Sequence, residues 1–152
     1  MKIFLLTHEL ELNKATNTGA IAIKHAGDTI EKILWQRVNP NKQLAELIDN
    51  NQALLLYPAE ESAAADIKDY DNIVIIDGTW QQSRKIFNKS TYLKKMPAAT
   101  LKATEPSKYL LRRNQVHGGL CTIECVIEVL KIKGDFGLAS KLEIEFSRFN
   151  KK

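Results

Sequence analysis

The chain has 152 residues, a formal net charge of +4, 44% hydrophobic residues and 26% charged residues. This length fits one domain with a substantial core, and the composition excludes a disordered chain. Cys121 and Cys125, its two cysteines, are too few for a disulfide framework or a four-cysteine zinc site.

Short apolar runs alternate with polar turns through the first part of the chain. Residues 2–7 are typical of a buried strand, and this run is too short for a signal peptide or a membrane span, so we expect no membrane association and a cytoplasmic location. Asn17 or Thr18 is expected to cap a short helix. The next expected elements are a strand at 29–35, a helix at 42–50 opened by Asn41, and a strand at 53–57.

The second part of the chain continues the alternation of strands and helices. Residues 72–77 give the clearest strand, because they are β-branched and almost wholly apolar. The expected elements after it are a helix at 79–87 stopped by Asn88, a weaker strand at 99–103, a helix at 120–133 with Gly134 as its C-cap, and a helix at 136–149. This pattern predicts an α/β fold: a single domain with a mainly parallel sheet flanked by helices.

The charges are unevenly distributed along the chain. Residues 43–83 hold eight acids and one base, whereas residues 84–113 hold nine bases and one acid, a net charge of +8. A basic block of this size indicates a polyanionic partner such as RNA or DNA, with a solvated lysine-rich surface as the alternative.

Two expected strands end in loops that contain reactive or aromatic side chains. The two loops are residues 56–60 and 77–80. Parallel sheets bind their ligands where such loops meet. Asp77 precedes a helix, so it either caps that helix or lies beside backbone amides that bind an anion. Trp80 is expected either to pack in the core or to stack on a base.

A third group of candidates surrounds Gly118 and Gly119. Tyr109–Arg113 precede these glycines, and Thr122 and Glu124 follow them at the start of a helix. Cys121 and Cys125 share one helical face and are expected to be buried thiols, since no further soft ligands are near in sequence; we expect no metal.

Together these segments resemble the DTW-domain family, the tRNA-uridine aminocarboxypropyltransferases of the TDD superfamily, which are related to the SPOUT-like RNA-modifying enzymes. The resemblance covers about residues 3–133. The matching pieces, in order, are Asn17-Thr18-Gly19, Leu56-Tyr57-Pro58, Asp77-Gly78-Thr79-Trp80 with the following Gln81–Lys85, Tyr109–Arg113 and Leu120–Glu124.

The resemblance implies S-adenosylmethionine as the co-substrate and N3 of a tRNA uridine as the acceptor, giving acp3U and methylthioadenosine. It also implies a SPOUT-like fold, and such a fold allows a knot near the C-terminus. Many relatives begin with a cysteine cluster that looks zinc-binding. This sequence starts directly at the first strand, so we expect the contribution of that cluster to be absent or replaced.

The residue roles that follow from the resemblance fall into three sets. The catalytic candidates are Asp77 as the base, Glu124 second to it, and Trp80 as a stacking surface. The cofactor-binding candidates are Leu56, Tyr57, Pro58, Thr79, Arg112, Leu120 and Thr122, of which Arg112 and Thr122 would hold the methionine carboxylate. The tRNA-binding candidates are Arg84, Lys85, Lys94, Lys95, Lys108 and Arg113.

Two other functions fit the same sequence. One is a SPOUT-type RNA methyltransferase, which would release S-adenosylhomocysteine. The other is a non-catalytic RNA-binding module, which would bind tRNA without S-adenosylmethionine. The sequence leaves the oligomeric state open, with a monomer as the default expectation.

Overall fold

The structure is a computed structural model that describes residues 1–58, 65–101, 107–109 and 120–151. It contains one sheet of five strands in the order β2-β1-β4-β3-β5, and every pair of neighbours is parallel. The strands are β1 (Lys2–Thr7), β2 (Ile30–Leu34), β3 (Ala53–Leu56), β4 (Asn72–Asp77) and β5 (Ala98–Ala99). Their carboxyl ends therefore lie along one edge, where Thr7 of β1 is paired with Asp77 of β4.

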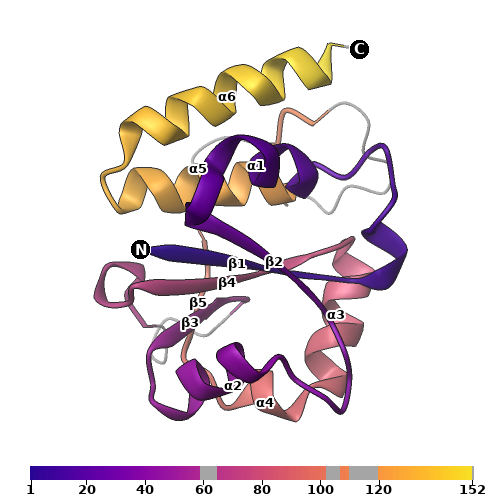
Figure 1. The fold of residues 1–152 in the computed structure, drawn as a ribbon, viewed down its shortest axis with the longest axis vertical. Helices are drawn as coiled ribbons and strands as arrows, with labels where there is room; N and C mark the ends of the chain where they lie inside the picture. Colours follow the sequence, from indigo (N-terminus) through magenta and orange to yellow (C-terminus); the bar gives the residue numbers. More distant parts are fainter. Residues whose placement is uncertain (59–64, 102–106, 110–119, 152) are drawn as a thin grey trace.

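Helices cover both faces of the sheet (Figure 1). On one face lie α1 (Gly19–Ala26) and α5 (Thr122–Ile132), with α6 (Phe136–Asn150) packed on both. The other face is covered by α2 (Lys42–Asp49), α3 (Trp80–Lys89) and α4 (Thr91–Lys94). Single 3-10 turns occur at η1 (Glu9–Glu11), η2 (Gly27–Thr29) and η4 (Ile67–Asp69).

The apolar runs in the strands fill two cores, one on each face of the sheet. Ile3 and Leu5 of β1 point into the core beneath α1, α5 and α6, and Phe4 and Leu6 point into the core above α2, α3 and α4. All four side chains are at most 1% exposed. A strand buried on both faces needs an apolar residue at every position, because successive side chains alternate between faces.

The expected α/β architecture with a parallel sheet is confirmed. The helix that Asn41 opens begins as predicted, and Gly134 follows α5 with a φ of 84°, a left-handed conformation that suits glycine. Asn88 does not end α3, which continues to Lys89. The strand predicted at 99–103 is wrong in position: β5 ends at Ala99 and residues 102–106 lie outside the described part.

The SPOUT-like relationship and the C-terminal knot stay predictions, since residues 110–119 lie outside the described residues. Within the described ranges, no helix combines the length and the apolar character that crossing a membrane requires.

Candidate active site

Asp77 lies at the centre of a cluster of hydrogen bonds at the carboxyl edge of the sheet. Its side chain is 2% exposed. Oδ1 accepts from Thr122 Oγ1 at 2.8 Å and from Asn17 Nδ2 at 3.0 Å. Oδ2 accepts from the same Asn17 amide at 3.1 Å and from Thr7 Oγ1 at 3.3 Å. One carboxylate thus joins β1, β4, the start of α1 and the start of α5.

The local backbone explains why these groups meet. Asp77 is the last residue of β4 and pairs with Thr7, so their side chains point the same way from neighbouring strands. Gly19 approaches the carboxylate so closely that a Cβ built on it would lie 2.8 Å from Asp77 Oδ2. The glycine is required here because a side chain would displace the carboxylate.

The environment of Asp77 changes its basicity. Burial is the largest influence and raises the pKa of Asp77, and the hydrogen bonds from Thr122, Asn17 and Thr7 work in the opposite direction. The negative charge of Glu11 raises the pKa further. The net result is a raised pKa, so Asp77 holds a proton more strongly than an exposed aspartate does.

The Asn17-Thr18-Gly19 segment makes hydrogen bonds to both β4 and α5. Thr18 occupies the N-cap position of α1 without a capping bond from its side chain, and Asn17 provides that bond, because its Oδ1 accepts from the backbone N–H of Ala20 at 2.9 Å. Thr18 Oγ1 instead accepts from the backbone N–H of Ile123 at 3.1 Å and satisfies a donor in the first turn of α5. The α5 helix is therefore fixed against the start of α1.

Glu124 has a different environment from Asp77. Its carboxylate accepts from Ser107 Oγ, from the backbone N–H of Lys108 at 2.9 Å and from the backbone N–H of Cys121 at 3.1 Å. Burial raises the pKa of Glu124, but these hydrogen bonds outweigh it and the pKa is lowered. Glu124 is therefore a weaker base than Asp77, and its carboxylate binds two chain segments together.

The thiol of Cys121 lies beside Glu124 at the start of α5. It is 6% exposed, and burial raises its pKa well above the ordinary thiol value, with the neighbouring Glu124 charge acting in the same direction. Cys121 is therefore protonated at neutral pH and unsuited to nucleophilic chemistry. Among the residues that the structure describes, no group of three His, Cys, Asp or Glu side chains is placed to hold a metal ion.

Three aromatic rings stack between the end of β3 and α3: Tyr57 follows β3, and Trp80 and Phe87 belong to α3. Tyr57 stacks on Phe87 with ring centroids 4.1 Å apart, and its ring also stacks with Trp80 at 5.8 Å. Trp80 is half-buried, so part of its surface is open to a ligand. Leu56 and Tyr57 are likewise half-buried, and Pro58 is exposed. Burial raises the pKa of Tyr57, against the effect of the Arg84 charge, so Tyr57 stays neutral.

Of the roles that the sequence left open for Asp77, the cap of α3 is wrong. Thr79 caps this helix: its Oγ1 accepts from the N–H of Gln82 at 3.1 Å, and its own N–H donates to Gln82 Oε1 at 2.8 Å. This reciprocal pair also occupies the Thr79 amide that was a candidate for anion binding. Asp77 is free of the helix because its carboxylate faces Asn17 and Thr122 instead.

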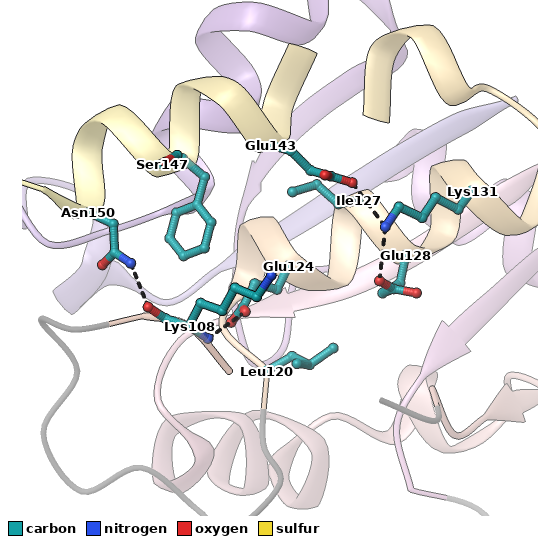
Figure 2. Close-up of a pocket in the computed structure, with 10 residues that line it drawn as sticks. Lys108, Leu120, Glu124, Ile127, Glu128, Lys131, Glu143, Ser147 and Asn150 are labelled. Atoms are coloured by element: carbon teal, nitrogen blue, oxygen red, sulfur yellow. Dashed lines mark hydrogen bonds and ion pairs between the residues drawn. The ribbon is translucent and has the colours of Figure 1, made fainter. Parts of the chain in front are cut away.

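A cavity of about 380 Å³ opens between α5 and α6 (Figure 2). Leu120 and Glu124 line it, and Asn150 Nδ2 donates to the Lys108 carbonyl at its side. Lys131 Nζ lies 2.9 Å from Glu143 and 3.7 Å from Glu128, so charges of opposite sign face one another in the cavity. Two residues predicted to bind the cofactor thus lie in different places. Leu120 lines this cavity, whereas Thr122 contacts Asp77.

The structure divides the predicted tRNA-binding residues between two layers. Arg84 and Lys85 on α3, with Lys94 and Lys95 at α4, are exposed on the α2–α3–α4 side of the sheet. Lys108 instead lies beside α5 and α6. Arg112 and Arg113 lie outside the described residues, so their predicted roles stay predictions.

Sequence reasoning missed several groups that build the site. Thr7 and Asn17 lie 70 and 60 positions from Asp77 in the sequence, so no local pattern could predict their hydrogen bonds to it. Ser107 and Phe87 were also missed: Ser107 is 17 positions from Glu124, and the ring partner of Phe87 is Tyr57 on another element. The Asn-Thr-Gly sequence was a usable signal, because it combines a capping side chain with a glycine before an apolar helix.

Comparisons with known proteins agree with the sequence motifs. The chain is 32% identical over 93 residues to tRNA-uridine aminocarboxypropyltransferase 2 of Drosophila melanogaster, covering 59% of this chain and 37% of the relative. It is 27% identical over 141 residues to the protein of the same name from Macaca fascicularis, covering 86% of this chain and 47% of the relative. The chain therefore spans less than half the length of these curated relatives. No solved structure matches.

A family model described as the DTW domain matches residues 1–152. The match includes the strand that ends at Asp77 and the helix that begins at Thr122. The chain therefore belongs to the DTW-domain family.

Proposed function

We propose that this protein transfers the 3-amino-3-carboxypropyl group of S-adenosylmethionine to N3 of a tRNA uridine. The names of the similar proteins support this activity, and membership of the DTW-domain family agrees with it. The observation that carries the proposal is the meeting of Asp77, Asn17 and Thr122 at the carboxyl edge of a parallel sheet, where ligands of such sheets bind.

The reaction is a substitution that depends on position. The uridine N3 lone pair forms a bond to Cγ of the methionine arm, and the bond from Cγ to sulfur breaks with its electron pair left on sulfur. Methylthioadenosine leaves. All three carbons on the sulfonium are activated, so the enzyme selects the product by which carbon it aligns with N3.

The aromatic rings provide a surface for the adenosine half of the substrate. Trp80 is half-buried and supported from behind by Tyr57, which is itself supported by Phe87. A rigid aromatic surface of this kind binds a nucleobase by stacking. Leu56 and Pro58 flank Tyr57 and provide apolar walls.

Uridine N3 carries a proton that must leave before the nitrogen becomes a good nucleophile. Asp77 is the proposed base, since its raised pKa makes it the stronger base of the two carboxylates. The tRNA phosphates are proposed to contact Arg84, Lys85, Lys94 and Lys95, which share one side of the molecule. The proposed setting is a cytoplasmic monomer.

The product of the reaction tests this function directly. Purified protein is incubated with unmodified tRNA and S-adenosylmethionine, and the digested nucleosides and the small-molecule product are identified by mass spectrometry. We expect acp3U together with methylthioadenosine. S-Adenosylhomocysteine with a methylated base would show a methyltransferase, and tRNA binding without either product would show a binding module. An Asp77→Asn variant should lose about 10²–10⁴-fold in rate.

A further inference from the structure

We propose that Thr122 relays the proton from uridine N3 to Asp77, and this inference rests on the proposed function. The carboxylate of Asp77 is 2% exposed, so a substrate atom meets one of its hydrogen-bond partners first. A buried carboxylate can still take a proton from the substrate if one of its hydrogen-bond partners accepts that proton and donates its own proton to the carboxylate.

Three side chains in the described part of the chain donate to Asp77. Thr7 is fully buried, at 0% exposure, and its hydroxyl also lies 3.2 Å from the Leu5 carbonyl. Asn17 uses a carboxamide, which does not exchange protons as a hydroxyl does, and its oxygen already caps α1. Thr122 is half-buried, so part of its surface reaches solvent, and its hydroxyl lies 2.8 Å from Asp77 Oδ1. Thr122 therefore combines access with the required chemistry.

The position of Thr122 in α5 determines the direction of its hydrogen bond. It is the first residue of the helix, so it lacks the preceding turn whose carbonyl a helical threonine hydroxyl usually bonds. An ionised carboxylate only accepts, so the hydroxyl hydrogen of Thr122 points to Asp77. The lone pairs of the oxygen are then available to a donor such as the N3–H of uridine.

Neighbouring bonds hold Thr122 in place. The N–H of Ile123 donates to Thr18, and Glu124 accepts from the N–H of Cys121, so the residues on both sides of Thr122 are fixed. A relay needs such a fixed oxygen, because proton transfer requires short and well-aligned hydrogen bonds.

The proton balance is complete with the groups present. The N3 proton moves to Thr122 Oγ1 while the Thr122 hydroxyl proton moves to Asp77 Oδ1. The N3 electron pair then forms the bond to Cγ, and the sulfonium takes the electrons of the broken bond. Threonine ends unchanged, and Asp77 returns its proton to solvent through the same hydroxyl after product release.

The test compares Thr122→Val, Thr122→Ser and Asp77→Asn, with Thr91→Val as the matched control. Thr91 is also the first residue of a helix, but it is exposed and lies on α4, which covers the opposite face of the sheet from α5. Methylthioadenosine formation is measured at saturating tRNA and varied S-adenosylmethionine. Thr122→Val should lose about 10²–10³-fold in kcat with KM changed less than about threefold, and Thr122→Ser should stay within about tenfold of the wild type.

The double variant Thr122→Val with Asp77→Asn distinguishes a relay from two separate contributions. If Thr122 acts through Asp77, the double variant is no slower than Asp77→Asn alone, since the pathway is already lost. Multiplied losses, or full activity in Thr122→Val, would overturn the relay while leaving the proposed function in place. A wild type that makes no methylthioadenosine would overturn the proposed function itself. Thr122→Ala replaces the valine variant if circular dichroism shows that the latter is unfolded.

Discussion

Glu124 accepts a hydrogen bond from the backbone N–H of Lys108 at 2.9 Å, while its second oxygen accepts from the N–H of Cys121. Lys108 precedes residues 110–119 in the chain and Cys121 follows them. One carboxylate therefore holds both neighbours of this segment at the start of α5, within a few residues of Thr122.

Replacing this carboxylate should destabilise the protein in a pH-dependent way. Glu124→Gln replaces the charged acceptor of three hydrogen bonds with a neutral amide, so the free energy of unfolding should fall by about 1–3 kcal/mol at neutral pH. The folded-state pKa of Glu124 is lowered below its ordinary 4.5, so the stabilisation is present above that value and disappears as the pH falls through the folded-state pKa. Urea unfolding of both proteins at several pH values measures this.

The glycine beside Asp77 gives a second test with an internal control. In Gly19→Ala the new methyl group would lie 2.8 Å from Asp77 Oδ2, so activity should fall more than tenfold and the melting temperature should drop. Gly137 lies in α6, where a built Cβ would have no atom within 4 Å apart from its chain neighbours and the backbone of the helix itself. Gly137→Ala should raise stability by about 0.5–1 kcal/mol and leave activity intact. Equal behaviour of the two variants would contradict the close contact at Asp77.

The division of basic residues between layers predicts which side binds tRNA. Lys94→Glu with Lys95→Glu should weaken tRNA binding at least tenfold and flatten its salt dependence, because counterion release accompanies each phosphate contact. The matched control is Lys24→Glu with Lys141→Glu, which makes the same charge change at exposed positions on α1 and α6. Filter binding at several salt concentrations compares the two. An equal loss in both would point to net charge rather than a docking side.

Stacking on Trp80 predicts a graded series for nucleoside binding. Trp80→Leu should weaken methylthioadenosine binding about tenfold to a hundredfold, whereas Trp80→Phe should lose less because it keeps an aromatic face. Isothermal titration measures both affinities. Unchanged affinity in the leucine variant would remove Trp80 from the adenosine site and leave it as packing for Tyr57.

Local patterns predicted the elements that local physics determines. Both boundaries of the strand at 72–77 were predicted correctly, since its apolar run lies between Asp71 and Gly78. The α4 helix was missed because the four residues Thr91–Lys94 are too few to show helical periodicity. The sequence left a cap of α3 open as one role for Asp77 and could not show its hydrogen bonds, because its partners Asn17 and Thr122 come from distant parts of the chain. The capping role went to Thr79, two residues later.

The hydrogen bonds of Asp77 also set an order of events during synthesis. Strands β1 to β4 leave the ribosome before Thr122 does, so a nascent chain can form most of the sheet while the carboxylate has Thr7 and Asn17 but still lacks Thr122. The α5 helix then brings Thr122 to the carboxylate. The proposed active site therefore needs α5, and the core beneath α1 is complete only once α5 and α6 have been added to it.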